Sequence, residues 1–272
     1  MIADYHLHTP LCRHAEGLPS AFAGQAVALG LPEIGFSDHS PMAQTFDDWR
    51  MLHEELPRYF EIVADARTAH PELTIRLGLE VDYLDGHEPW IAKLAGMAEW
   101  DYFIGGVHYI TPDWDVDNPK WLGSGRWEQQ PIDEVWRMYF AACERAIRSR
   151  LFDFHAHPDL VKKFGHRPGG DLRRFYDPVI QAAVDTGAVF EINTAGLRNS
   201  VGEQYPGAEF LRLQREAGVP IVISSDAHKP EDVGRDFPVA HRLAWELGWR
   251  ESVRFEKRAA TTVPLPAPTP VT

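Results

Sequence analysis

The sequence predicts an α/β fold, a distorted (β/α)7 TIM-like barrel that forms a single domain. Predicted strands and helices alternate along the chain, which is typical of parallel βαβ units. Polar residues follow almost every predicted strand directly, at its carboxyl end. A barrel brings these ends together at one mouth, whereas an open sheet would spread them along an edge. We therefore expect a barrel with its functional site at that mouth.

The first half of the chain contains four predicted strands, and a helical pattern follows each of them. Residues 19–30 are rich in alanine, and Gly30 ends this first helix. Pro57 should break or kink the second helix, because proline lacks the N–H that a helix interior needs. The predicted strands are residues 2–8, 34–39, 73–83 and 101–109, and the predicted helices are residues 19–30, 47–69, 88–99 and 131–150.

The second half continues the alternation and ends in a proline-rich segment. Residues 110–130 show no periodicity, and a long irregular segment of this kind is often a lid or a binding loop. We expect a barrel domain over residues 1–258 and a C-terminal tail over residues 259–272. The remaining predicted strands are residues 152–157, 188–193, 219–225 and 252–257, and the helices are residues 175–186, 205–217 and 238–247.

The composition indicates a protein with a large core and no membrane span. Of the 272 residues, 44% are apolar, and no apolar run reaches the roughly 18 residues that suggest a membrane helix. The chain begins without a basic segment followed by an apolar one, so we expect no secretory signal. Two cysteines without a Cys-x-x-Cys motif predict no disulfide framework and fit a reducing cytoplasm.

The charge of the chain bears on its partners. The formal net charge is −13, which argues against a broad nucleic-acid surface, since such surfaces are normally basic. It does not argue against a small phosphorylated substrate, because local cations and metals attract phosphate. We therefore expect a small-molecule partner, no nucleic acid and no membrane, and the oligomeric state stays open.

Histidines near the start of the chain predict a metal site. His6 and His8 lie two residues apart on the first predicted strand, where side chains alternate between faces, so both point the same way. Two imidazoles in this arrangement can bind one ion, and His14 can return to it after a turn. Asp226 and His228 repeat the same spacing after the seventh strand.

Nine side chains near the predicted strand ends are candidate ligands. Their nitrogen and oxygen donors suit Zn, Mn or Fe, and they are too many for one ion. We expect two or three divalent ions, with Glu80 as a carboxylate bridge. Such ions can bind a phosphoryl oxygen, generate a hydroxide near neutral pH and stabilise the leaving oxygen. The candidate ligands are His6, His8, His14, His39, Glu80, His108, His157, Asp226 and His228.

Simpler interpretations exist for several of these residues. An isolated His-x-His is more often packed or exposed than bound to metal, and the alternative for Glu80 is a solvated carboxylate at a strand end. Strand alternation places His155 on the same face as His157, and Pro158 beside His157 makes His157 the better ligand candidate. His155 is then a supporting or simply packed residue, and Cys12 is expected to be a buried neutral thiol.

These motifs resemble those of the polymerase and histidinol phosphatase (PHP) superfamily, amidohydrolase-like (β/α)7 barrels with a multinuclear metal site. The superfamily marks are an initial His-x-His, a strand-ending Asp-His, a Glu, two later histidines and a final Asp-x-His. More narrowly, the chain looks like the histidinol-phosphate phosphatase branch. The segments that carry the resemblance are residues 6–8, 8–15, 38–39, 78–83, 108, 157–161, 191–198, 224–228 and 254–258.

The resemblance implies a metal-dependent phosphomonoesterase that hydrolyses L-histidinol phosphate to L-histidinol and phosphate. It implies catalytic roles for the ligands Glu80, Asp226 and His228. Arg198, with Lys163 or Lys162, would balance the charge of the phosphoryl oxygens. Many relatives would have an arginine near the two lysines, and a lysine binds phosphate only as a point charge, so the second phosphate contact stays open.

We predict that residues 110–130 contact the imidazole and ammonium groups of the substrate. Asp117 is a candidate substrate contact, because a carboxylate suits an ammonium group. The alternative is that the aromatic residues of this segment merely pack it onto the barrel. The other candidates in the segment are Asp115, Trp114, Trp121 and Trp127.

Two other functions stay open at this level. One is a PHP-type phosphodiesterase or exonuclease on nucleotides or nucleic-acid ends, against which the acidic charge and the lack of basic stripes count. The other is a barrel that uses metal only for structure or has lost its activity. The complete set of expected ligand types counts against that, because a structural site does not need an open cluster of several ions.

Overall fold

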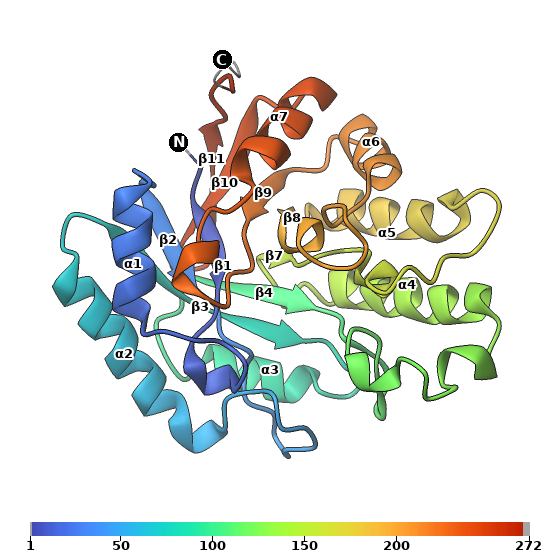
Figure 1. Ribbon diagram of the computed structural model, residues 1–272, viewed down its shortest axis with the longest axis horizontal. Helices are drawn as coiled ribbons and strands as arrows, with labels where there is room; N and C mark the ends of the chain where they lie inside the picture. The colour runs from blue at the N-terminus through green and yellow to red at the C-terminus, as the bar shows by residue number, and fades with distance from the viewer. Residues whose placement is uncertain (1, 269–272) are drawn as a thin grey trace.

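Within residues 2–268, the part of the chain that the structure describes, seven parallel strands form one sheet surrounded by helices (Figure 1). The structure is a computed structural model. Each strand of the sheet pairs with the next sheet strand along the chain, and within the described residues the pairs β5–β6 and β10–β11 form two separate small sheets. The sheet consists of β1 Asp4–Leu7, β2 Glu33–Phe36, β3 Thr74–Asp82, β4 Tyr102–Gly106, β7 Phe154–His155, β8 Phe190–Asn193 and β9 Ile221–Ser224.

The sheet closes into a nearly complete barrel between its first and last strands. Leu7 forms a parallel bridge with Ala227, just after β9. The N–H of His8 donates to Ala227 O at 3.0 Å, and the N–H of Ala227 donates to His6 O at 3.0 Å. Within residues 2–268, β1 and β9 are thus joined by an isolated bridge and not by a continuous ladder of hydrogen bonds. The predicted distorted (β/α)7 barrel is confirmed.

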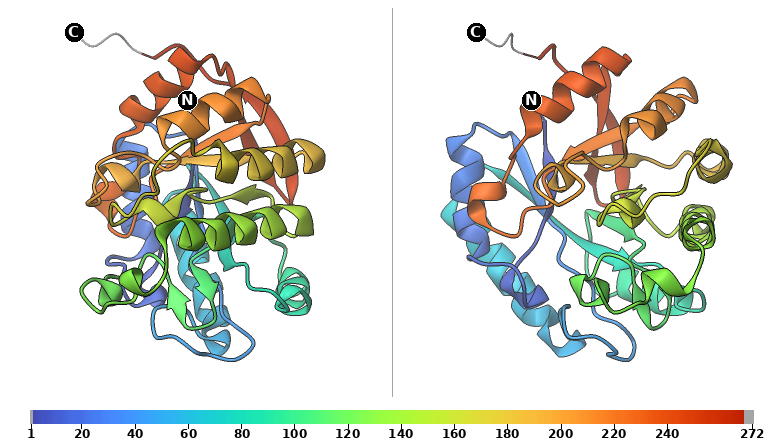
Figure 2. Two further views of the ribbon diagram at one scale, coloured as in Figure 1. Left: turned by 90° about the vertical axis from the view of Figure 1, so that its right-hand side faces the viewer. Right: turned by 45° about the vertical axis from the view of Figure 1, so that its right-hand side comes forward.

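The helices lie outside the barrel and cover the outer faces of its strands (Figure 2). The helix predicted over residues 47–69 begins only at Leu56, with Pro57 in its first turn, so residues 41–52 are an irregular loop. Proline is favoured there because the first N–H groups of a helix have no partner within it. Within residues 2–268, no helix is long and apolar enough to cross a membrane. The helices are α1 Pro19–Ala28, α2 Leu56–Ala69, α3 Glu88–Ala95, α4 Ile132–Ser149, α5 Arg173–Thr186, α6 Ala208–Glu216 and α7 Phe237–Leu247.

Aromatic side chains fill the barrel below its mouth. The hydroxyl of Tyr102 donates to Tyr5 O at 2.7 Å and lies 3.1 Å from Phe36 O, so one ring ties β4 to β1 and β2. Gly35 and Gly78 leave room for this ring, since a Cβ at Gly78 would lie 2.5 Å from Tyr102 Cε2. The interior is therefore a packed core and not a channel.

The amino-terminal end of the barrel is covered by an antiparallel hairpin of β10 Glu251–Glu256 and β11 Ala259–Pro264. The short strand predicted over residues 252–257 is confirmed. The predicted start of the tail at residue 259 is wrong, because residues 259–264 pair with β10. Val253 and Phe255 pack in the same core as Tyr102. The last part of the predicted tail, residues 269–272, lies outside the described residues.

The segment of residues 110–130 is only partly irregular. β5 Tyr109–Thr111 pairs with β6 Trp114–Asp115, and two short 3-10 turns follow, Pro119–Trp121 and Trp127–Gln129. Trp114 and Trp127 are buried in the core that α4 and α5 form against the barrel. These two tryptophans therefore pack the segment onto the barrel.

The substitution Gly78→Ala tests how tightly Tyr102 fills the barrel. The new methyl group would meet the buried ring, and overpacking of this kind typically costs about 1–3 kcal/mol. We expect the free energy of unfolding in urea to fall by about that amount. Gly169→Ala is the matched control, because nothing lies within 4 Å of its added Cβ. Equal stability of Gly78→Ala and wild type would contradict the packing.

Candidate metal centre

The first strand places two imidazoles in the mouth of the barrel. His6 in β1 and His8, one residue past the end of this strand, are fully buried. His6 Nε2 lies 3.3 Å from Glu80 Oε2, and His8 Nε2 lies 3.7 Å from the same oxygen. His8 Nε2 also lies 3.3 Å from Asp226 Oδ1, which links the first strand to the last.

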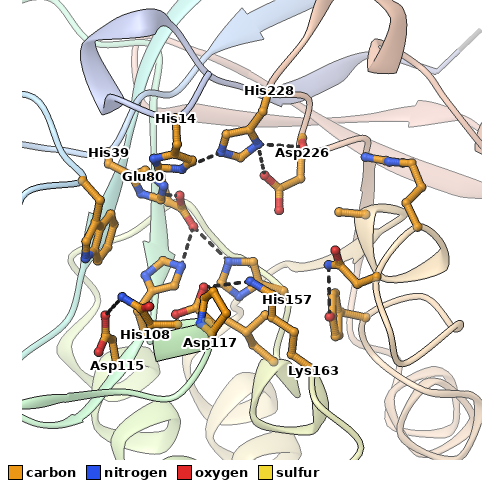
Figure 3. Close-up of a pocket in the computed structure, with 18 of the residues that line it drawn as sticks. His14, His39, Glu80, His108, Asp115, Asp117, His157, Lys163, Asp226 and His228 are labelled. Carbon is orange, nitrogen blue, oxygen red and sulfur yellow. Dashed lines mark hydrogen bonds and ion pairs between the residues drawn. The ribbon is translucent and has the colours of Figure 1, made fainter. Parts of the chain in front are cut away.

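Glu80 stands at the centre of this group (Figure 3). Its Oε1 lies 3.0 Å from His157 Nε2 and 3.6 Å from His108 Nε2, while Oε2 lies 2.9 Å from His39 Nδ1. The side chain is 1% exposed, so the solvated alternative for Glu80 does not hold. Burial disfavours the charged form, but His6 and the other imidazoles keep the pKa of this carboxyl well below its usual range.

The remaining candidates complete the group on the side of the cavity (Figure 3). His14 Nε2 lies 2.9 Å from His228 Nε2, and the His228 ring stacks on His8 with centroids 4.0 Å apart. His228 Nδ1 lies 3.5 Å from Asp226 Oδ1. The structure thus brings all nine predicted side chains together.

Two carboxylates that the sequence did not single out hold these imidazoles from behind. Glu191 Oε1 lies 2.8 Å from His6 Nδ1, and Glu191 Oε2 accepts the backbone N–H of His157 at 2.9 Å. Asp82 Oδ1 lies 2.6 Å from His108 Nδ1. A carboxylate on the outer nitrogen fixes the ring and leaves its other nitrogen free to bind metal. The available signal was alternation, which puts Asp82 on the face of Glu80.

The donor set fits divalent metal ions. Within the described part of the chain, His6 Nε2, both ring nitrogens of His8, His39 Nδ1 and Glu80 Oε2 are buried without a hydrogen-bond partner. Unsatisfied buried polar atoms are costly, and cations would satisfy them. Several triplets have donor atoms within 4.8 Å of one another, among them His6–His8–Glu80, Glu80–His108–His157 and His8–His39–His228.

A cavity of about 600 Å3 opens beside these side chains, and two predicted cations line it. Arg198 donates to Ser225 O at 2.7 Å, which anchors its guanidinium in the wall. Lys163 Nζ lies 3.1 Å from Asp117 Oδ2. Burial opposes the charge of Asp117, but Lys163 and His108 keep the pKa of its carboxyl below the usual value. The cavity therefore offers positive groups beside the metal centre.

The structure places Lys162 elsewhere, so its predicted contact with phosphate is wrong. Its side chain is fully buried, with Nζ 2.7 Å from Asp159 Oδ2 and 2.8 Å from Glu203 Oε1, and it donates to Gln204 O at 2.9 Å. Lys162 ends a 3-10 turn, in which consecutive side chains point about a third of a turn apart. Lys163 consequently faces the cavity, and Lys162 faces the interior.

The expectation that His155 and His157 share a face is also wrong. β7 ends at His155, and His157 has a left-handed backbone with φ of 25°, so strand alternation does not extend to it. His155 packs against Phe152 and Phe190 on the helix side of the barrel. Burial lowers the pKa of His155 to about 3, which fits a neutral packed ring.

A tryptophan in the wall of the cavity comes from a loop that the sequence did not single out. Trp114, Trp121 and Trp127 do not line the cavity, whereas Trp49 from the loop of residues 41–52 does. Its only sequence signal was a tryptophan next to acidic residues. Cys12 is fully buried, as expected, with a donor atom within 4.8 Å of those of His14 and His228. The neutral state of its thiol stays a prediction.

This fold and this donor set define a class: a (β/α)7 barrel with a divalent-metal centre at the carboxyl ends of its strands. The PHP domain model matches residues 4–195, which is more than half of the chain. The chain belongs to the PHP domain family.

Known relatives match almost the whole chain. The probable histidinol-phosphatase of Deinococcus radiodurans is 40% identical, over 94% of this chain and 97% of that protein. The histidinol-phosphatase of Bacillus subtilis is 28% identical, over 85% of this chain and 95% of its own length. The crystal structure of histidinol phosphate phosphatase from Lactococcus lactis, complexed with Zn, L-histidinol and phosphate, has a TM-score of 0.77 at 22% identity and covers 96% of this chain and 98% of that chain. At this identity, the structural likeness shows the fold.

The substitution Lys162→Met tests the buried ion cluster. It leaves Asp159 and Glu203 without their shared cation, and breaking a buried pair in this way typically costs about 3–5 kcal/mol. We expect the free energy of unfolding in urea to fall by about 3 kcal/mol or more. Lys163→Met is the matched control, since its partly exposed pair with Asp117 should contribute only about 0–1 kcal/mol. Equal stabilities of the two variants would contradict the conclusion that Lys162 is the cation of a buried ion cluster.

Proposed function

We propose that this chain is a metal-dependent phosphomonoesterase that hydrolyses L-histidinol phosphate to L-histidinol and phosphate. The observation that carries this proposal is the buried donor cluster around Glu80, which opens into a cavity that also holds Arg198 and Lys163. Similarity to histidinol-phosphatases along nearly the whole chain, with 40% identity to the Deinococcus radiodurans protein, supports the same substrate.

We propose that the centre holds two or three divalent ions, of Zn, Mn or Fe. Overlapping donor triplets support more than one ion, and imidazoles mixed with carboxylates suit these metals. Glu80 belongs to two triplets, one with His6 and His8 and one with His108 and His157, as expected of a bridging carboxylate. Bound ions of this kind supply Lewis acidity to a phosphoryl oxygen and lower the pKa of water.

The charged groups of the cavity have distinct proposed roles. Arg198 binds the phosphoryl oxygens through its planar fork, and Lys163 adds a point charge on the same group. Asp226 and His228 line the cavity next to the donor cluster. With Glu80, they are the proposed catalytic groups: they would hold the ions that supply a hydroxide for attack on phosphorus, and a metal ligand or the bound water would pass a proton to the leaving oxygen of L-histidinol.

The rest of the cavity suits the organic part of the substrate. L-histidinol carries an ammonium group and an imidazole, which need a carboxylate and an aromatic or polar surface. Asp117 provides the carboxylate and Trp49 an aromatic surface in the cavity wall. A net charge of −13 and a cavity of about 600 Å3 support a small-molecule partner over nucleic acid or a membrane surface.

Kinetics on the purified protein test the proposed function. We expect hydrolysis of histidinol phosphate, no degradation of single-stranded DNA, and Zn, Mn or Fe in the same sample by elemental analysis. Chelation should abolish turnover, and the divalent ion should restore it. DNA degradation without release of phosphate from histidinol phosphate would support the phosphodiesterase alternative instead. Full turnover by metal-free protein would contradict a metal-dependent mechanism.

The substitution Asp117→Asn tests how the substrate is selected. We expect kcat/KM for histidinol phosphate to fall about tenfold or more, because a charge-assisted contact is typically worth about 1.5–3 kcal/mol. With p-nitrophenyl phosphate, which has no ammonium group, kcat/KM should not fall, since Lys163 is released from its pair with Asp117. Equal losses for both substrates would show that Asp117 does not bind the ammonium group of the substrate.

A further inference from the structure

Arg50 is a buried arginine in the irregular loop of residues 41–52, outside the donor cluster. It is 2% exposed, and it lies between two carboxylates from different parts of the chain. Its Nε and Nη2 donate to Asp47 at 2.7–2.9 Å. On the other side, Nη1 lies 2.9 Å from Asp82 Oδ2 and donates to Ser40 O at 3.2 Å. The guanidinium thus joins two anionic groups that would otherwise be buried without a cation.

The contact of Arg50 with Asp82 connects it to the proposed metal ligand His108. Asp82 uses Oδ2 for Arg50 and Oδ1 for His108 Nδ1, at 2.6 Å. This holds the ring with Nε2 directed at Glu80, 3.6 Å away. The orientation of Asp82 therefore decides the orientation and tautomer of His108, and Arg50 holds Asp82.

The contact of Arg50 with Asp47 connects it to the wall of the cavity. Asp47 also accepts the Tyr109 hydroxyl at 2.8 Å, and Tyr109 in turn accepts the Trp49 indole N–H at 3.1 Å. The Arg50 guanidinium lies 4.2 Å from the centre of the Trp49 ring. The Trp49 ring also contacts His39 edge-on, at a centroid distance of 4.7 Å, so this part of the cavity wall lies directly against the donor cluster.

We propose that Arg50 is a positioning residue that couples the metal ligand His108 to the substrate wall around Trp49. Both ends of this coupling rest on the function proposed above. The planar guanidinium can pair with Asp47 and Asp82 at once, which a lysine ammonium cannot do in the same geometry. Loss of the Arg50 guanidinium should therefore disturb both the position of His108 and that of Trp49. Loss of the Asp47 carboxylate should disturb the position of Trp49 alone.

The test compares Arg50→Met with Asp47→Asn in the full-length protein, by Zn²⁺ affinity in chelator competition and by steady-state kinetics. For Arg50→Met we expect about 10- to 100-fold weaker binding of the most weakly held Zn²⁺, the range typical of lost supporting contacts, together with a raised KM for histidinol phosphate. For Asp47→Asn we expect a raised KM with wild-type Zn²⁺ affinity. The control Arg58→Met, which removes an exposed pair with Glu61 on α2, should change neither quantity.

Wild-type Zn²⁺ affinity in Arg50→Met overturns the proposal, and so does an equal loss of Zn²⁺ affinity in Asp47→Asn, which would indicate general loosening. If Arg50→Met does not fold, Arg50→Lys decides, because it keeps the charge but not the fork. Wild-type Zn²⁺ affinity and KM in Arg50→Lys would also overturn the coupling. Wild-type protein that binds no Zn²⁺ or leaves histidinol phosphate intact would contradict the proposed function instead.

Discussion

The burial of one carboxylate, that of Glu80, constrains the whole mouth of the barrel. A charge removed from water is stable only with partners of opposite charge or with metal. The neighbours of Glu80 come from β1, from the end of β2 and from the segments after β4 and β7. An open sheet would give this residue neighbours from adjacent strands only. The curvature of the barrel therefore lets side chains from strands two positions away on either side of β3 reach one buried anion.

The support for this centre extends outward in layers of alternating charge. Glu191 and Asp82 hold imidazoles from behind, and Arg50 in turn holds Asp82. Each layer holds a group of the layer inside it through a hydrogen bond or an ion pair. Below the mouth, Tyr102 and the hairpin of β10 and β11 fill the barrel with apolar contacts. The apolar core thus lies below the mouth of the barrel, and the unsatisfied donor atoms gather in the mouth around Glu80.

Local rules predicted much of the site. Alternation predicted one face for His6 and His8, both of which lie close to Glu80, and the same rule placed Asp82 on the face of Glu80. Those rules ended where the backbone left the regular geometry. The left-handed backbone of His157 separated it from His155, and the 3-10 turn at Lys162 turned that side chain away from the cavity. Neither conformation has a signal in residue type, because lysine and histidine are found in many backbone states.

The sequence alone determined the order of the βα units, the residue types of the donor cluster and the ends of the strands that carry them. These follow from periodicity and spacing, which act over a few residues. Only the tertiary structure decided which cation faces the cavity, which carboxylates stand behind the imidazoles and that Trp49 lines the wall in place of Trp114 and Trp127. Such contacts join residues far apart in the chain, so they depend on how the closed barrel brings its loops together and on which buried charges it must pair.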